Sequence, residues 1–443
     1  MNPEFTIDEM GAWSRVPADL KAALADDIQA DVVVIGGGCT GLSTALQLRA
    51  AGADVVVLEE DFAGCGASGR NTGVVTGAIV QDLSLTRRLL GLELAAARAG
   101  FADAAVKYLE EVIELHAVQC DYTPSGTLTV TLHPVQEPEL NKKREIAKQY
   151  GSPVRFLSSG EMRERGLPPA FLSGVVEEQG GTLDPGKYMS GLREAALGAG
   201  VRLFEGTRVI ELVDGPRVVV EAEGGRVSAH YAVLGTNAYT PGLGRLGRMV
   251  VPIRVSLFET DRLGREPRER LGWHGREPVN TAHELAETYL LSARDTLVGG
   301  VKVASYPWGS KLGAADDPSA FRVIQRAFRE RLPELREVGV ARFWSGWTAF
   351  TTDFNPVFGV EGRHGNILYG LGYAGHGLSQ GTLMGAVLAE RILGREHRLE
   401  AAVRRRVRRW PPEPFRWVGA KLLISKLMAA DRRIDRRIRR AHG

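Results

Sequence analysis

The stretch that decides the fold is DVVVIGGGCTGLSTALQLRAAGADVVVLE, residues 31–59. It opens with the β-branched run 31–35, which is typical of a strand buried on both faces. A glycine turn of the form GxGxxG follows, and then an apolar-periodic segment predicts a helix that ends at Gly52. A second buried strand, residues 54–58, leads to Glu59. The stretch therefore predicts a βαβ unit with an acid at the end of its second strand.

Each part of this unit suits the binding of a dinucleotide. Gly36 makes the tight turn, Gly38 lets the backbone approach a pyrophosphate, and Gly41 lets the helix pack closely on the strand. The N-terminus of the helix offers N–H groups and a partial positive charge to the phosphates. Glu59 is expected to accept hydrogen bonds from a ribose, and its charge disfavours NADP, whose ribose phosphate it would repel. The alternative, an ordinary glycine-rich turn, is disfavoured by the order strand, turn, helix, strand and acid.

The bulk composition is that of a soluble globular protein. The chain has 443 residues, 44% hydrophobic and 25% charged, and this length predicts two packed domains. Residues 401–443 hold fourteen Lys and Arg against three acids, whereas the rest of the chain is net −8. Neither the cysteines nor the histidines show ligand spacing, so no metal site is expected. The sequence shows no signal peptide and no run of about 20 apolar residues, so we expect a cytoplasmic protein.

Three further glycine-containing motifs carry a resemblance to a known family. GGGCTGLSTALQLRAAGADVVVLEE followed by GASGRNTG resembles the FAD-dependent amine and amino-acid oxidase superfamily, which includes D-amino-acid oxidase, glycine oxidase and sarcosine oxidase. The GASGRN form is most similar to the gamma-glutamylputrescine oxidase branch. TxDxxPxxG, which begins at Thr351, and GxxGHG, which begins at Gly372, extend the resemblance over about residues 30–395.

The resemblance implies an α/β fold, with a Rossmann-like FAD-binding domain and an interleaved antiparallel-sheet (α+β) substrate domain. Buried strands next to glycine turns mark the first domain, and helices and alternating strands mark the second. The expected boundaries are residues 1–30 for an N-terminal arm, 31–83, 181–250 and 343–400 for the FAD-binding domain, 84–180 and 251–342 for the substrate domain, and 401–443 for a basic C-terminal helical tail.

The cofactor expected from the resemblance is FAD, and several segments should contact it. In the family, the backbone groups at the position of Val209 contact the adenine. The helix after the GxxGHG motif would point its N-terminus at the flavin's pyrimidine carbonyl, where negative charge develops on reduction. The expected FAD-binding residues are Gly36, Gly38, Cys39, Thr40, Gly41, Glu59, Glu60, Ala67, Ser68, Gly69, Arg70, Asn71, Val209, Thr236, Asn237, Gly372, Tyr373, Gly375, His376, Gly377 and Leu378.

Some positions depart from the family pattern. Gly346 stands where some relatives carry a flavin-bound cysteine, and Arg70 lies where others use a histidine, so FAD should be held without a covalent bond. Amino-acid oxidases place a carboxylate-binding arginine before the TxD motif, and here Trp347 and Thr348 stand in that place. This departure favours an amine substrate, or an amino acid gripped elsewhere, for instance by Arg254.

Lys302 and His376 are the candidate catalytic residues. Lys302 resembles a lysine of sarcosine oxidases that promotes reaction with dioxygen, and a solvated lysine on a strand edge is the alternative. His376 could act as a base, but in the family this histidine lines the flavin, and we favour that role. Aromatic residues nearby would wall a pocket, with plain core packing as the alternative. The expected substrate pocket holds Tyr289, Trp347, Thr348 and Tyr373.

The expected reaction is oxidation of a carbon–nitrogen bond. A neutral amine would give a hydride to the flavin, and the imine would be hydrolysed to a carbonyl compound and an amine. Dioxygen, giving hydrogen peroxide, or another acceptor would take the electrons. Two alternatives stay open: a membrane-docked dehydrogenase that passes electrons to quinone, and a non-catalytic FAD-containing subunit. No nucleic-acid-reading module accompanies the basic tail, so no nucleic-acid partner is expected.

The tail has the pattern of a basic amphipathic helix. Apolar residues recur at helical spacing between Trp417 and Ile438, and Lys and Arg cover the remaining faces. Such a helix can lie on an anionic membrane or pack on the acidic body of the protein. We expect residues 415–430 to pack on the body and residues 432–443 to be exposed, so that their deletion leaves flavin content intact.

Overall fold

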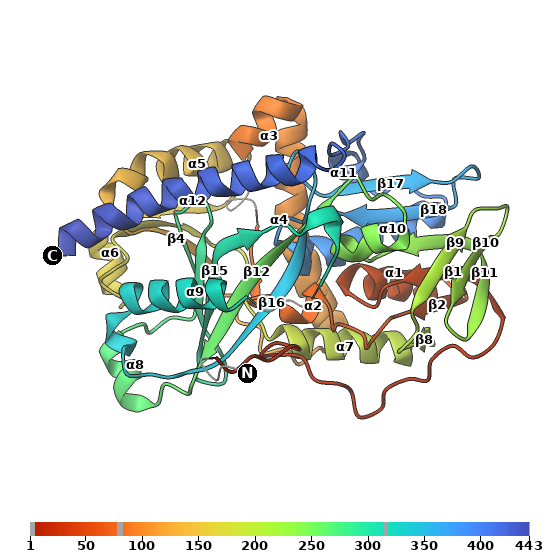
Figure 1. The fold of residues 1–443 in the computed structure, drawn as a ribbon, viewed down its shortest axis with the longest axis horizontal. Helices are drawn as coiled ribbons and strands as arrows, with labels where there is room; N and C mark the ends of the chain where they lie inside the picture. The colour runs from red at the N-terminus through yellow and green to blue at the C-terminus, as the bar shows by residue number, and fades with distance from the viewer. Residues whose placement is uncertain (1–4, 78–82, 314–316, 443) are drawn as a thin grey trace.

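The computed structural model describes residues 5–77, 83–313 and 317–442, and these residues form two large sheets and one two-stranded sheet. Figure 1 shows the first large sheet on the right and the second in the left half of the molecule. The last helix, α12 (Phe415–His442), lies across the second sheet and ends at the far left.

The first sheet is built on the βαβ unit that the sequence predicts. β1 (Ile28–Ile35) pairs in parallel with β2 (Val55–Leu58) on one side and with β11 (Gly225–Leu234) on the other. All four residues of β2 are buried, as expected for a strand covered on both faces. The strand path is β17-β18-β11-β1-β2-β8, and β9 and β10 extend it from β11. The remaining bounds are β8 (Arg202–Phe204), β9 (Val209–Val213), β10 (Val218–Ala222), β17 (Val357–Glu361) and β18 (Ile367–Leu371).

One close contact fixes α1 (Cys39–Ala50) on this sheet. A Cβ built at Gly41 would lie 1.9 Å from the carbonyl oxygen of Gly36, so any side chain at Gly41 would force the helix off the strand. Gly36 has a φ of +101°, a conformation that favours glycine. The N-terminus of α1 is therefore held at the carboxyl end of β1, and α10 (Gly377–Ile392) packs against α1.

The second sheet has the order β16-β12-β15-β14-β13-β4-β6-β5. Its pairs are antiparallel except β13 with β4. In the pairing of β15 (Leu297–Ser305) with β12, Gly300 lies opposite Leu257 and Ala304 lies opposite Val255. The segment of β15 between these two pairs is longer than the matching segment of β12, so β15 bulges there. The remaining bounds are β4 (Thr127–Thr131), β5 (Val154–Leu157), β6 (Ser173–Glu177), β12 (Val251–Thr260), β13 (Val279–Thr281), β14 (Glu287–Leu291) and β16 (Val340–Phe350); β3 (Val74–Val75) and β7 (Gly181–Thr182) form the small sheet.

Helices cover both large sheets. None of the helices in the described part of the chain is long and apolar enough to cross a membrane. The polar helix α5 (Glu137–Gln149) lies in the part of the chain that was assigned to the substrate domain. The other helices are α2 (Ala67–Arg70), α3 (Leu83–Leu90), α4 (Leu92–Leu115), α6 (Ser159–Glu164), α7 (Pro185–Gly198), α8 (Arg265–Leu271), α9 (Pro318–Arg331) and α11 (Glu400–Val403).

The α/β class is present, but two expected domain boundaries differ from the structure. β16 pairs with β12 along its length and belongs to the second sheet, although residues from 343 onward were expected in the FAD-binding domain. α4 buries Phe101 and Val106 in the same core cluster as α1, although its residues were expected in the substrate domain. A strand or helix pattern in the sequence indicates the element but not the sheet or helix that it packs on.

A buried cluster of charged side chains joins α12 to the second sheet. Asp435 pairs with Lys302 at 3.0 Å and with Arg331, and Lys302 also pairs with Glu287 at 2.6 Å. The side chains of Arg331 and Glu287 are only 1% and 2% exposed. Burial alone would raise the pKa of Glu287, but the charges of Arg331 and Lys302 lower it to about 2. Two cations and two carboxylates therefore compensate one another inside the protein.

His283 also reaches this cluster, with its Nε2 3.4 Å from Asp435 Oδ1. His283, Glu287 and Asp435 could present three ligand atoms within 4.8 Å of one another, a convergence that the sequence spacing did not indicate. Lys302 and Arg331 already contact the same carboxylates and would repel a cation. We therefore interpret the group as an ion-pair network, and the expectation of no metal stays a prediction.

The expectation that residues 432–443 are exposed holds for the arginines but is wrong for two residues of the segment. Asp435 and Ile438 are buried, whereas the arginines of this segment are exposed, and two of them, Arg433 and Arg437, also line the rim of the cavity described below. One turn earlier, Asp431 accepts hydrogen bonds from the N–H groups of Glu284 at 2.8 Å and Leu285 at 3.0 Å. The periodicity of the sequence indicated the apolar stripe correctly. It could not show that Asp431 and Asp435 make buried contacts with other segments of the chain.

Because these contacts are buried, we expect Asp435→Asn and Lys302→Met each to lower the free energy of unfolding by about 3 kcal/mol. Deletion of residues 432–443 should be at least as damaging. Although burial raises the pKa of Asp435, its contacts with His283, Lys302 and Arg331 lower it overall. The effect of Asp435→Asn should therefore be full above the ordinary carboxyl pKa and shrink as the pH falls below it.

Thermal and denaturant unfolding at several pH values measure this effect. Arg436→Gln, on the exposed face of the same helix, is the control and should change stability by less than about 0.5 kcal/mol. Wild-type stability in the Asp435 variant would show that the cluster does not hold α12 in place.

Candidate active site

A cavity of about 2080 Å³ runs along the edge where the two sheets meet. Its walls include the loops at the carboxyl ends of β1, β2, β11 and β18, and side chains from β12, β15 and β16. In open α/β sheets, ligands bind at this edge because the strand ends and helix N-termini point there. The cavity continues between α5 and α12, which the sequence did not indicate.

The first glycine turn makes one end of the cavity suitable for a pyrophosphate. Gly38 is extended and precedes α1, and as a glycine it has no side chain with which to cap that helix. The hydroxyl of Ser68 accepts a hydrogen bond from the N–H of Cys39 at 3.1 Å. A Cβ built at Gly38 would lie 2.8 Å from this hydroxyl, so the cradle is open only because Gly38 has no side chain. The N-terminus of α1 and the bare backbone at Gly38 fit the phosphates of FAD.

Glu59 lies at the carboxyl end of β2, in the cavity wall. Its carboxylate accepts hydrogen bonds from the N–H groups of Gly37 at 2.7 Å and Asp61 at 3.1 Å. Burial raises the pKa of Glu59, while these two hydrogen bonds oppose the rise. The acid is therefore held in a fixed position next to the glycine turn, where it could accept hydrogen bonds from a ribose.

The glycine-rich loop after β2 is held by aromatic donors from two other segments. Trp344 Nε1 donates to the carbonyl oxygen of Arg70 at 2.8 Å, and Trp13 Nε1 donates to that of Asn71 at 2.8 Å. A Cβ built at Gly346 would lie 3.8 Å from the Cβ of Arg70. The two positions at which relatives tether a flavin are thus neighbours here, and neither carries a cysteine or a histidine.

The two distant glycine motifs are joined by a side chain. Asn237 Oδ1 accepts a hydrogen bond from the N–H of Gly372 at 2.9 Å, and the hydroxyls of Thr40 and Tyr373 lie 2.7 Å apart. Gly372 has a φ of +81°, so the turn that leads into α10 needs glycine there. These contacts place the N-terminus of α10 beside that of α1.

His376 precedes the first residue of α10 and lines the cavity. Burial and the charge of Arg98 lower the pKa of His376 to about 4, so the imidazole is neutral at pH 7. Arg98 is fully buried and donates from Nε to Asn355 at 3.1 Å, and its other two nitrogens have no hydrogen-bond partner among the described residues. The sequence analysis missed Arg98, because nothing in a helical pattern marks a buried arginine.

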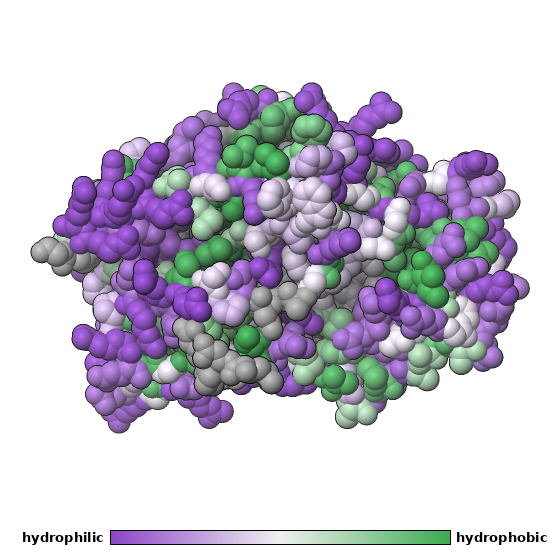
Figure 2. All heavy atoms as spheres, in the orientation of Figure 1, coloured by the Kyte–Doolittle hydropathy of each residue, from purple (hydrophilic) through white to green (hydrophobic). Residues whose placement is uncertain are grey.

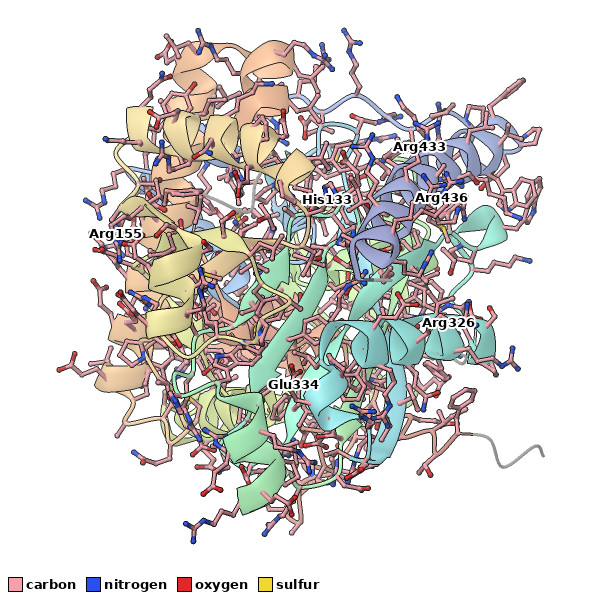
Figure 3. All side chains as sticks on the ribbon, turned by 90° about the vertical axis from the view of Figure 1, so that its left-hand side faces the viewer. His133, Arg155, Arg326, Glu334, Arg433 and Arg436 are labelled. Carbon is pink, nitrogen blue, oxygen red and sulfur yellow. The ribbon has the colours of Figure 1, made fainter. Side chains whose placement is uncertain are left out.

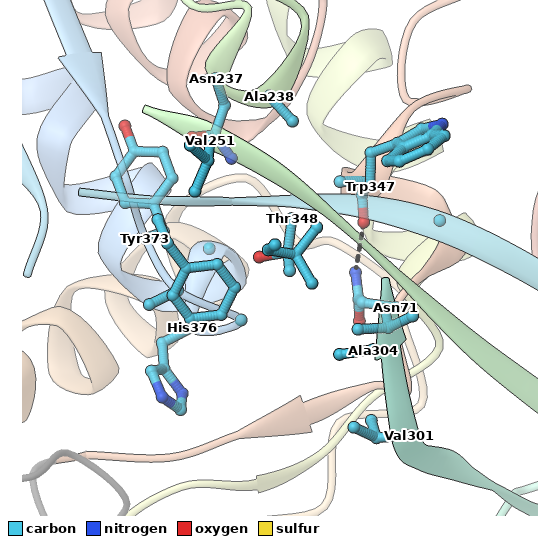
Figure 4. A pocket seen from close by; sticks show the side chains of 18 of the residues that line it. Asn71, Asn237, Ala238, Val251, Val301, Ala304, Trp347, Thr348, Tyr373 and His376 are labelled. Atoms are coloured by element: carbon cyan, nitrogen blue, oxygen red, sulfur yellow. Dashed lines mark hydrogen bonds between the residues drawn. The ribbon is translucent and has the colours of Figure 1, made fainter. Parts of the chain in front are cut away.

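The expected substrate residues separate into two groups. Trp347, Thr348 and Tyr373 line the cavity, and Figure 4 shows them around one space with His376. Tyr289 does not line the cavity; its hydroxyl donates to Glu287 at 2.8 Å inside the core. The alternating pattern of β14 could not show which face of the strand meets the cavity.

Lys302 is also away from the cavity wall. Val301 and Ala304 of β15 line the cavity, whereas the ammonium group of Lys302 pairs with Glu287 and Asp435. Val301 and Lys302 both have positive φ, at the bulge of β15, so simple alternation fails there. The bulge gives Lys302 a place in the ion-pair network that the sequence did not predict.

Most of the expected cofactor residues come together in the cavity wall. Gly41, Gly69 and Gly372 do not line it, and each serves close packing or a turn instead. Further residues line the cavity that no motif indicated, chiefly from α12 and from residues 280–286. The expected cofactor residues in the wall are Gly36, Gly38, Cys39, Thr40, Glu59, Glu60, Ala67, Ser68, Arg70, Asn71, Val209, Thr236, Asn237, Tyr373, Gly375, His376, Gly377 and Leu378.

Comparison with known proteins gives a family match over most of the chain. The model of the family described as DAO, FAD dependent oxidoreductase, matches residues 31–391. Gamma-glutamylputrescine oxidoreductase of Escherichia coli (strain K12) is 29% identical over 388 residues, which are 85% of this chain and 87% of that protein. A probable oxidoreductase, OrdL, of Rhizobium meliloti (strain 1021) is 30% identical over 403 residues, 90% of this chain and 89% of that protein.

Solved structures share the fold. Glycine oxidase from Geobacillus kaustophilus superposes with a TM-score of 0.71 at 18% identity, covering 84% of this chain and 96% of that one. L-proline dehydrogenase from P. horikoshii superposes with a TM-score of 0.70 at 21% identity, with the same coverage of 84% and 96%. At these identities the match concerns the arrangement of the elements.

We expect Gly38→Val to be purified largely without flavin. A branched side chain would fill the space between the backbone and Ser68, where the pyrophosphate should lie, so flavin content should fall about tenfold or more. Absorbance of the purified protein measures the content. Gly198→Val is the control, since nothing lies within 4 Å of a Cβ built there, and a fully yellow Gly38→Val would place the cofactor elsewhere.

The flavin should be released by acid. Because Gly346 and Arg70 offer no thiol or imidazole at the tethering positions, acid precipitation should leave the yellow colour in the supernatant. A yellow pellet would mean that another residue bonds the flavin.

Proposed function

Because the chain belongs to the DAO family of FAD-dependent oxidoreductases, we propose that it oxidises a carbon–nitrogen bond of an amine or of an N-substituted amino acid. The chain is thus an FAD-dependent enzyme, as its motifs indicated. The side chains that line the cavity beside the turn at Gly372 support this substrate class. The name of one relative, gamma-glutamylputrescine oxidoreductase, points the same way.

The observation that carries the proposal is the uncharged character of the side chains labelled around Thr348, while the charged lining residues Arg70 and Asp353 belong to the neighbouring segments. Figure 4 shows ten labelled residues here, and none of them carries a charged side chain at neutral pH. Thr348 and Trp347 stand where a carboxylate-binding arginine would anchor an α-amino acid. An uncharged pocket favours the neutral form of a bound amine, because desolvation lowers the pKa of an ammonium group. A neutral amine is the form that can give up a hydride.

The residues of the chain have distinct parts in this reaction. When bound, FAD supplies the redox chemistry by accepting a hydride from the substrate carbon and passing the electrons to an acceptor. The N-terminus of α10 offers its partial positive charge at the place where negative charge develops. His376, neutral at pH 7, lines the wall and need not take a proton. Trp347 and Tyr373 exclude water from the reacting carbon.

Dioxygen is the proposed acceptor, with hydrogen peroxide as the product. The resemblance implies that Lys302 promotes the reaction with dioxygen, but its ammonium group is engaged by two carboxylates. Because the network is charge-compensated, its field on the cavity is weak, and the role of Lys302 stays a proposal that rests on the resemblance. If it holds, Lys302→Met should slow reoxidation beyond the loss that unfolding explains. A cytoplasmic location likewise stays a prediction from the sequence.

A membrane-docked dehydrogenase is the second candidate function, and one surface favours it. Figure 2 shows apolar side chains on the surface near the N-terminal half of α12, next to the hydrophilic surface of its C-terminal half. Phe415 and Leu422 on this helix are 69% and 67% exposed, and Lys421 and Lys426 are exposed beside them. Exposed apolar side chains among lysines can insert into an anionic membrane surface. Co-sedimentation with anionic vesicles, lost in Leu422→Gln, would support this function.

An anaerobic amine panel tests the proposed function. We expect at least one amine to bleach the flavin without dioxygen, and the bleached enzyme to be reoxidised by dioxygen alone with formation of hydrogen peroxide. Bleaching without reoxidation would favour the dehydrogenase. If no amine and no N-substituted amino acid bleaches the flavin, the chain is a non-catalytic FAD-containing subunit and the proposal fails.

A further inference from the structure

The end of the cavity between α5 and α12 has a different character from the uncharged region around Thr348. From α5, Leu140 and Lys143 line it, and from α12, Ile434, Arg433 and Arg437 line it. The α12 residues are spaced three and four apart, so they share one face of the helix. Figure 3 looks at this end of the molecule and shows Arg433 on α12 and His133 on the segment before α5.

One short segment of chain holds the two helices at this end. Gln136, next to the start of α5, donates from Nε2 to the carbonyl oxygen of Ala282 at 2.7 Å. Two and three residues further along, the N–H groups of Glu284 and Leu285 donate to Asp431 of α12. Lys143 follows Gln136 by two helical turns, and Arg433 follows Asp431 by two residues. The basic side chains from both helices therefore line the same end of the cavity.

The three basic side chains at this end are available to bind a ligand. Lys143, Arg433 and Arg437 make no hydrogen bond or ion pair with any described residue, whereas Arg439 on the outer side pairs with Glu330 at 3.2 Å. Uncommitted arginines along a cavity wall are suited to bidentate binding of a carboxylate.

Three acids also lie in this part of the wall, and two of them are engaged. Asp431 accepts the two backbone hydrogen bonds, and Glu139 pairs with Lys142 at 3.7 Å. Glu284 is exposed and makes no side-chain contact with a described residue. Backbone hydrogen bonds do not remove the charge of Asp431, so the formal charge left for a ligand is three cations against the two carboxylates of Asp431 and Glu284.

We propose that Arg433, Arg437 and Lys143 form an anion site that binds a carboxylate at the end of the substrate remote from the reacting amine. The site rests on the proposed function and narrows its substrate class to amines that carry such a remote carboxylate. A carboxylate beside the amine would meet the uncharged surface at Thr348, whereas a remote one reaches the cations on α5 and α12. Leu427 and Ile434 give the connecting part of the substrate an apolar wall.

The experiment uses the FAD-loaded full chain and the double variant Arg433→Gln/Arg437→Gln. Linear ω-amino carboxylates of increasing length, each compared with its ω-amino carboxamide, are titrated anaerobically while flavin reduction is followed. We expect the carboxylate of the best length to bind about tenfold or more tighter than its amide, and the double variant to abolish this difference. The effect should appear mainly in the concentration that half-saturates reduction and less in the limiting rate, because neither arginine is among the side chains grouped around Thr348.

A binding measurement keeps this inference separate from the proposed function. The alkyl carboxylate of the same length, which has no amine to oxidise, should bind the wild type by calorimetry, and the double variant should bind it about tenfold more weakly. This result would support the anion site even if no amine bleached the flavin. An amine panel that works without any preference for carboxylates would overturn the site and leave the proposed function standing.

Two matched variants test the geometry. Arg436→Gln removes an arginine that lies on α12 outside the cavity wall, and it should leave carboxylate binding unchanged. Glu284→Gln removes the opposing charge and should tighten carboxylate binding. If Arg436→Gln weakens binding as much as the double variant, the arginines act only through the general field of the helix and the site is refuted.

Discussion

The approach of Gly41 to the carbonyl oxygen of Gly36 is the contact on which the rest of the site depends. With 1.9 Å between that oxygen and a Cβ at Gly41, the helix can sit on the strand only because no side chain is present. This contact fixes the N-terminus of α1 at the carboxyl end of β1 and keeps the backbone at Gly38 bare. The second helix N-terminus, that of α10, is then placed by Asn237 and Tyr373, which bond across to the turn and to α1.

β16 connects the cofactor loop to the second sheet. Its pairing with β12 aligns Thr348 with Ile253 and Gly346 with Val255, so the strand that belongs to the substrate sheet ends against the cofactor loop. Trp344 of this strand donates to the loop at Arg70. The reacting part of the cavity is thus assembled from both sheets, and its uncharged character follows from which residues of β16 face it.

α12 closes the cavity from the other side and is held by electrostatics as much as by its apolar stripe. Ion pairs inside a protein stabilise it only when each charge is compensated, and here Asp435 and Glu287 face Lys302 and Arg331. The inward face of the helix supplies these contacts and the cavity wall, and its outer face carries the remaining arginines. A tail that is basic in composition is therefore an integral part of the fold.

The sequence by itself determined the nucleotide-binding unit, the α/β class and the family, because a glycine at Gly36, Gly38 or Gly41 reports a local backbone requirement that no other residue meets. It also indicated most of the cofactor wall, since those residues follow strand ends within a few positions. The tertiary structure alone decided the partners of elements far apart in the chain. At the bulge of β15, the side chain of Lys302 points toward an ion-pair network, and Arg98 is buried near His376. Strand register and helix packing depend on contacts between distant segments, which local sequence patterns do not record.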